Sequence, residues 1–365
     1  MRKIIYAILF SIFFIGCAST SISPVEEKPK IEEENLKLEA YMKTYAGYPE
    51  LVKRGFDIHS LDYIKSKEEF VNALKPYFYD YEDGTAFDNH FGVYSSIQSE
   101  LSTCYRPVFT DEYGTKDELL KKGYIEDETM FYYPSNGEKD WRVGKRISNH
   151  LIHSPGNDHL SGWLVPGTLC LNPKSYGFVE KDDFILLRIA EHPRNPNSYS
   201  DFFKKAKKKN IIIIDLTWDI GGCADDALSF LRGFKSLKDK KVIVLADGDT
   251  RSCGEYLLAN LKTYPNVTVI GGSSMGATRY SVDLTDFHDF PKLGIMKFTV
   301  SLPIDGSTLE LGKNVKHLLK EGIGISPDYW ISTEEDCIKC INLVVGYDLF
   351  PVEKNVLFNL MLFKK

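Results

Sequence analysis

The sequence lacks the features expected of a nucleic-acid-binding or membrane-spanning protein. Its 365 residues include 45 Lys and Arg against 51 Asp and Glu, giving a formal net charge of −6. No basic stripe is present that could follow a phosphate backbone. The apolar run Ile4 to Ile15 is only about a dozen residues, too short for a helix that crosses a bilayer. We therefore expect a folded protein with no nucleic-acid partner.

The sequence also lacks a recognisable metal-binding motif. His150, His153 and His159 lie close together, but without the His-Glu-x-x-His spacing that places two ligands and a base on one helical face. Pro155 and Gly156 break any helix in this segment, so we expect a loop with three exposed histidines. No metal and no other cofactor is expected.

Cysteine is scarce, at 7 residues, and its spacing does not indicate redox catalysis. Cys337 and Cys340 form a C-x-x-C pair without the strand and helix of a thioredoxin-like motif. A local disulfide or two inert thiols is the favoured interpretation. Cys104 and Cys170 are candidates for a second bridge, since an exported protein can form disulfides.

The N-terminus predicts export. A basic start and the short apolar run are followed by a small-residue site that ends in Cys17, so residues 1–16 are typical of a signal peptide. The site resembles the bacterial lipobox, with Phe14 where leucine is usual. We expect Cys17 to be lipidated, which would anchor the protein in the bacterial cell envelope, facing the periplasm or the surface. A plain secretory signal cut nearby is the alternative.

Composition divides the rest of the chain into four segments. Residues 17–35 are rich in Ser, Pro, Glu and Lys and predict a disordered tether. Helical spacing of apolar residues predicts a helical cap over 36–91, and aromatic, turn-rich sequence predicts a β-rich region over 92–183. Residues 184–365 are expected to form an α/β core with a parallel-containing sheet and crossover helices.

Two strand–turn–helix units in this core carry the chemistry. The apolar run 210–214 ends in a polar turn with Gly221 and Gly222, and the apolar run 241–246 is followed by Ser252 and a helical stretch. In a parallel sheet both turns lie at the carboxyl edge, so they should face each other. Ser252 then sits at a strand-to-helix corner, where unpaired backbone N–H groups can stabilise an oxyanion.

These motifs resemble the C-terminal processing, or tail-specific, serine peptidase family. The resemblance covers about residues 184–332. Four family motifs occur in order, namely D-L-R-x-N-x-G-G at 215–222 with Thr217 for Arg and Asp219 for Asn, S-A-G-E at 252–255 with Cys253 for Ala, V-I-G-x-x-T-x-G at 269–276, and G-V-x-P-D at 324–328.

One departure concerns the general base. The bacterial branch of the family has a lysine after the third motif, where this chain has Ala277, and the nearby Arg279 stays protonated at all ordinary pH values. The tricorn-like branch uses a histidine from the N-terminal part instead, and the segment around His90 resembles it. In that branch a glutamate at the position of Glu321 orients the histidine through an intervening hydroxyl.

The resemblance implies a serine peptidase that acts on a protein or peptide substrate. Without the lysine, the alternative is an inactive peptidase-like fold that binds peptides or partners in the cell envelope. The expected roles are Ser252 as nucleophile, His90 as base, Glu321 as its orienting group, the N–H groups of Gly222 and Cys253 as oxyanion donors, and Gly221 and Glu255 as supporting residues.

Overall fold

The computed structural model describes residues 31–45, 47–78, 92–94, 103–134, 139–150, 176–190, 192–193, 197–222, 224–278, 280–281, 287–290, 293, 295–299, 303–304, 312–353 and 356–357. The expected signal peptide and Cys17 lie outside these residues. No helix within them is both long and apolar enough to cross a membrane.

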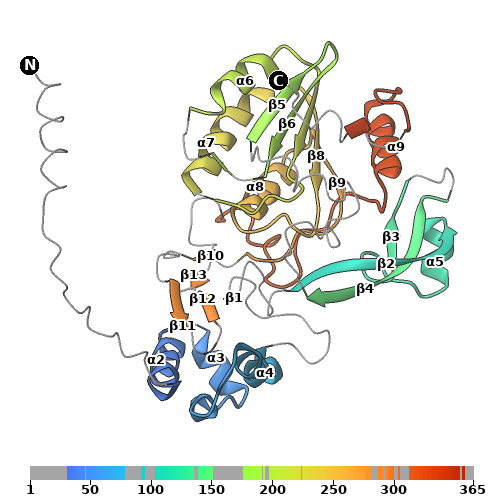
Figure 1. The fold of residues 1–365 in the computed structure, drawn as a ribbon. Helices are drawn as coiled ribbons and strands as arrows, with labels where there is room; N and C mark the ends of the chain where they lie inside the picture. The colour runs from blue at the N-terminus through green and yellow to red at the C-terminus, as the bar shows by residue number, and fades with distance from the viewer. Residues whose placement is uncertain are drawn as a thin grey trace, which may run out of the picture.

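A mixed α/β core is built on a six-stranded sheet (Figure 1). Its strand order is β14-β9-β8-β7-β6-β5, and every neighbouring pair is parallel except β5 with β6. The parallel arrangement of the core confirms the α/β prediction. The strands are β5 (Tyr176–Glu180), β6 (Phe184–Ile189), β7 (Ile211–Asp215), β8 (Lys241–Ala246), β9 (Val267–Gly271) and β14 (Tyr329–Trp330).

Both faces of the sheet are covered because its central strands are apolar on both sides. In β7, Ile212 and Ile214 face one core cluster, while Ile211 and Ile213 face another. The first cluster includes α6 (Ser200–Ala206), α7 (Ala224–Phe234) and α8 (Cys253–Lys262). The second includes α9 (Glu334–Val345) and part of the β-rich region, on the opposite side of the sheet in Figure 1.

The C-x-x-C pair lies on α9 within the second cluster. Cys337 and Cys340 are both buried free thiols, so the local disulfide does not form. Burial raises the pKa of Cys340 to about 12 and that of Cys337 well above its ordinary value. Two inert thiols are the outcome. Of the other candidate bridge, the side chain of Cys104 and all of Cys170 lie outside the described residues.

The N-terminal segment is helical, as its periodicity predicts. Its elements are α2 (Ile31–Thr44), α3 (Tyr48–Lys53), a 3₁₀ turn η1 (Ile58–Leu61) and α4 (Lys67–Phe78), which share one apolar core. However, α2 begins inside the segment 17–35 that was expected to be a tether. Tertiary contacts explain the earlier start, because Glu34 accepts from the Leu293 N–H and Asn35 donates to the carbonyls of Asp62 and Ile64.

The β-rich region forms a separate three-stranded sheet with one helix. Its elements are β2 (Thr103–Gly114), α5 (Lys116–Lys121), β3 (Met130–Tyr132) and β4 (Trp141–His150). Asn149 and His150 therefore end a strand, although a loop was expected there, because β4 pairs with β2 as far as Thr103. β5 belongs to the core sheet, so the core begins before residue 184.

A second small sheet lies beside the N-terminal helices in Figure 1. It consists of β1 (Gly92–Tyr94), β12 (Ile295–Thr299) and β11 (Phe287–Phe290), so it joins chain segments about 200 residues apart. Phe290 and Leu293 pack into the core of the N-terminal helices. The remaining pair is β10 (Tyr280–Ser281) with β13 (Pro303–Ile304). The packing of the 287–299 segment against the N-terminal helices has no signal in the local sequence.

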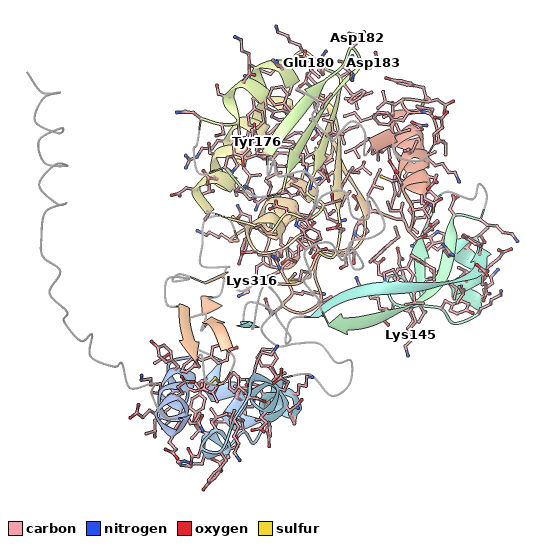
Figure 2. The ribbon with its side chains drawn as sticks, in the orientation of Figure 1. Lys145, Tyr176, Glu180, Asp182, Asp183 and Lys316 are labelled. Carbon is pink, nitrogen blue, oxygen red and sulfur yellow. The ribbon has the colours of Figure 1, made fainter. Side chains whose placement is uncertain are left out.

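The two ends of the core sheet carry different loops. Asp182 and Asp183 lie in the β5–β6 turn at one end, and Figure 2 shows Lys316 toward the other end. Near that second end, Arg188 of β6 pairs with Asp215 of β7 at 2.7 Å, with both side chains buried. The loops that follow β7 and β8 leave the sheet here, and they carry the candidate site.

Candidate active site

Ser252 occupies the corner between β8 and α8. It is partly exposed, and its backbone has φ +53° and ψ −123°, a conformation that residues other than glycine rarely adopt. The helix begins at the next residue, so its positive N-terminal end is beside the serine. The Ser252 hydroxyl makes no hydrogen bond to any residue that the structure describes.

The turn before Ser252 is fixed by a buried carboxylate. Asp247 Oδ1 accepts from the N–H groups of Asp249 and Thr250, and also from the N–H of Trp218 in the neighbouring loop. Burial, together with the nearby Asp249, raises the pKa of Asp247 well above its ordinary value. The Thr250 hydroxyl donates to the Leu216 carbonyl at 2.8 Å. These bonds hold together two loops, the serine loop between β8 and α8, which carries Ser252, and the glycine loop after β7, which carries Gly221 and Gly222.

The glycine loop lies directly against the serine corner. Gly221 and Gly222 have φ of +91° and +143°. A Cβ on Gly221 would approach Ser252 Cβ to 2.8 Å and the Cys253 nitrogen to 2.9 Å. The Gly222 N–H has no acceptor among the described residues. The two loops are therefore brought together as the sequence predicts, with Gly221 against Ser252 and the first residue of α8.

A buried histidine, which was not among the predicted site residues, packs against the glycine loop. His192 follows β6, and its side chain and that of Asp219 are both fully buried. His192 Nε2 lies 3.3 Å from Asp219 Oδ2, within ion-pair distance but outside hydrogen-bond geometry. On the other side of the ring, Nδ1 lies 3.2 Å from the Tyr199 hydroxyl. A lone His in a loop gives no periodic signal that could have revealed this contact.

Glu255 is buried in the first turn of α8 and joins it to the segment after β9. Its Oε1 accepts from the Ser274 hydroxyl at 2.6 Å and from the Gly276 N–H at 2.7 Å. Burial raises the pKa of Glu255 to about 7, although these hydrogen bonds lower it. Glu255 therefore ties the serine helix to the segment that carries Ala277.

Glu321 lies beside the position where the family lysine is missing. Ala277 is buried there, and the next residue, Thr278, donates both its N–H and its hydroxyl to Glu321 Oε2, at 2.7 and 3.1 Å. The carboxylate of Glu321 is thus hydrogen-bonded to a hydroxyl. His90, the expected base, lies outside the described residues, as do Cys223 and Arg279.

One group of side chains within the described residues has a spacing that could suit a metal ion. Glu39, His59 and Asp62 lie together on the N-terminal helices, far from Ser252 in sequence. The Lys43 ammonium already lies 2.5 Å from Glu39, so a cation is present there without a metal. Of the expected loop histidines, His153 and His159 lie outside the described residues.

The chain matches no family model and no curated protein. Among solved structures, it is similar to a lipoprotein from Streptococcus agalactiae at 12% identity and a TM-score of 0.39, over 87% of this chain and 97% of the other. It is similar to the tricorn protease at 12% identity and a TM-score of 0.41, over 87% of this chain and 37% of the protease. It is similar to the photosystem II D1 C-terminal processing protease at 15% identity and a TM-score of 0.31, over 60% and 59%. Similarity at this level assigns neither family nor activity.

Proposed function

We propose that this chain hydrolyses peptide bonds by acyl transfer from Ser252. The observation that carries the proposal is the conformation of Ser252, a non-glycine residue at φ +53° at the start of a helix, packed against a glycine pair. Strain of this kind costs about 1–3 kcal/mol and clusters at functional sites, where it presents a side chain in a fixed direction. The resemblance of four ordered sequence motifs to the tail-specific peptidases supports the same assignment.

The oxyanion would be held by backbone N–H groups of Gly222 and Cys253. A Cβ added to Gly221 would lie 2.8 Å from Ser252 Cβ. This close packing brings the glycine loop beside the carbonyl that the serine would attack. The helix that begins at Cys253 adds the positive end of its dipole. Donors of this kind typically contribute about 10²–10³ to kcat when they are placed at the developing charge.

His90 is the proposed general base. It would accept the Ser252 proton as Oγ attacks the carbonyl carbon, and it would donate that proton to the leaving amine as the C–N bond breaks. Water then hydrolyses the acyl ester by the same route. Support for this proposal is the Glu321 carboxylate, whose bonded Thr278 hydroxyl stands beside Ala277 and could orient the imidazole. Ala277 itself cannot accept a proton.

The protein would act as a lipoprotein in the bacterial cell envelope. The basic, apolar and small-residue pattern before Cys17 supports cleavage at that residue and attachment of acyl chains. Each buried CH₂ contributes about 0.8 kcal/mol, so more than one chain gives stable anchoring. Its substrates would then be proteins or peptides that reach the same compartment.

Chemical labelling of Ser252 tests the activity. The purified protein is incubated with a serine-directed phosphonate probe and, separately, with an unstructured protein substrate. We expect labelling and cleavage in the wild type and in Ser236→Ala, an exposed control serine, and neither in Ser252→Ala. Labelling that survives Ser252→Ala would reject the nucleophile.

The same assay separates the enzyme from a binding module. If His90 is the base, His90→Ala should lose about as much activity as Ser252→Ala, because members of one catalytic unit are not additive. Wild-type activity should also fall as the pH drops through the histidine pKa. A wild type that binds peptides but neither labels nor cleaves would instead favour the inactive peptidase-like fold, to which the missing lysine also points.

A further inference from the structure

The peptide group that joins Gly221 to Gly222 is held by the backbone of His192. Its carbonyl oxygen, on Gly221, accepts from the His192 N–H at 3.1 Å. The peptide bond between Gly221 and Gly222 is trans, as are all peptide bonds among the described residues. In a planar trans peptide the N–H points opposite to the carbonyl, so the Gly222 N–H points away from His192. Anchoring the carbonyl therefore aims the proposed oxyanion donor.

Asp219 fixes the preceding peptide group of the same loop. The Gly221 N–H donates to Asp219 Oδ1 at 2.8 Å, inside a fully buried environment. The Asp219 carbonyl also accepts from the Arg251 N–H at 2.8 Å, immediately before the serine. A Cβ on Gly254 would lie 2.8 Å from Asp219 Cγ, so the carboxylate packs against the first turn of α8. One residue thus connects the glycine loop to both sides of Ser252.

The imidazole of His192 completes the support. A Cβ on Gly222 would lie 3.0 Å from His192 Cβ, so the histidine packs directly against the second glycine. Burial raises the pKa of Tyr199, so its phenol keeps its proton and can donate to His192 Nδ1. On the other side of the ring, Nε2 faces Asp219 Oδ2 at 3.3 Å. The ring is thereby held between two buried polar groups.

We propose that Asp219 and His192 are positioning residues that fix the conformation of the glycine loop, acting through the Gly221 and Gly222 peptide groups. Both side chains are fully buried, so neither is exposed to a substrate. The inference rests on the proposed function, since an oxyanion must form for the loop to stabilise it. It assigns a task to a buried carboxylate and a buried imidazole that acyl transfer itself does not use.

Two variants of Asp219 separate the proposal from a general packing role. Asp219→Ala removes the acceptor of the Gly221 N–H. Asp219→Asn keeps an oxygen at that place and has nearly the same shape. Asp225→Ala, which removes an exposed carboxylate from α7, is the matched control. Each full-length variant is compared with the wild type by kcat, by KM and by hydrogen exchange of the Gly221 amide measured by NMR.

We expect Asp219→Ala to lower kcat by about 10²-fold while KM changes by less than about threefold. The displaced Gly222 N–H would stabilise negative charge that forms only in the transition state, so substrate binding is little affected. The Gly221 amide should exchange at least about tenfold faster. Asp219→Asn and Asp225→Ala should keep both properties near the wild-type values. Full kcat or unchanged Gly221 protection in Asp219→Ala would overturn the proposal.

The Asn variant keeps the test decisive if Asp219→Ala does not fold. A folded Asp219→Asn that loses Gly221 protection, or that loses kcat as severely as a missing oxyanion donor, would also overturn the proposal. If the wild type neither cleaves protein nor takes up the phosphonate, the proposed function fails. The Gly221 exchange rates of the Asp219 variants then still decide whether Asp219 holds the loop.

Discussion

Gly221 packs so closely against Ser252 that a methyl group on the glycine would come within 2.8 Å of the serine Cβ. Real Cβ atoms do not approach carbon this closely, so one of the two loops would have to move. The glycine is therefore required at this position for two independent reasons, its φ of +91° and the absence of space.

This contact predicts the effect of Gly221→Ala. Moving either loop displaces the proposed oxyanion donors from the serine, so we expect kcat to fall by at least about 10²-fold. The positive φ should also lower the free energy of unfolding by about 1–3 kcal/mol. Gly123→Ala is the control, because Gly123 has φ +89° but no atom within 4 Å of the added Cβ. It should lose stability and keep activity, and equal losses of activity in both variants would contradict the argument.

The conformation of Ser252 predicts a stability difference between two inactive variants. Ser252→Ala keeps a Cβ at φ +53°, whereas Ser252→Gly removes it. We expect the glycine variant to be more stable than the alanine variant by about 1–2 kcal/mol, measured as the free energy of unfolding in urea. Ordinary positions show the reverse order, since glycine loses more backbone entropy on folding. An alanine variant that is the more stable of the two would show that the corner is not strained.

The buried carboxyl of Glu255 predicts a pH dependence of stability. Its pKa of about 7 in the folded protein is above the ordinary value of 4.5, so the folded state holds an extra proton between these values. This contribution to stability is fully present below about pH 4.5 and is lost as the pH rises through 7, by at most about 3 kcal/mol.

Unfolding in urea at pH 5 and pH 8 measures this contribution. Glu255→Gln cannot titrate and keeps an oxygen acceptor for Ser274 and Gly276, so the difference between the two pH values should shrink relative to the wild type. The exposed Glu353→Gln is the matched control and should retain the wild-type difference. If Glu255→Gln also retained it, the buried carboxyl would not be the titrating group.

The N-terminal motif predicts covalent lipidation of Cys17. Cells grown with a fatty-acid analogue should yield labelled protein in the membrane fraction, and Cys17→Ser should be unlabelled because no thiol is available for acylation. Ser19→Ala, in the same segment, should be labelled like the wild type. Recovery of the wild type as unlabelled, freely dissolved protein would rule out the anchor.

The parts of the fold that were predictable have a strong local signal. The run Ile211 to Ile214 is β-branched and ends in a polar turn, and it forms a central strand. The serine corner followed from the same reasoning, because parallel strands bring their carboxyl-end loops to one edge. Both loops are found together, with Gly221 against Ser252.

The features that were not predictable depend on contacts between residues distant in sequence. His192 is identifiable only through Asp219 and Tyr199, which approach it in three dimensions. β5 was assigned to the region before the core, because its five residues have no clear polarity pattern and do not reveal which sheet they join. The start of α2 is likewise set by the distant Leu293 and not by composition.

The hydrogen bond between Glu34 and the Leu293 N–H has a consequence for how the chain matures. These residues are 259 positions apart, and Phe290 next to them completes the apolar core of the first helices. At a synthesis rate of about 5–20 residues per second, the early helices wait on the order of tens of seconds for the segment that covers them. Until then they keep exposed apolar surface and gain little stability. The first helices of the described residues are thus among the last elements to become fully folded.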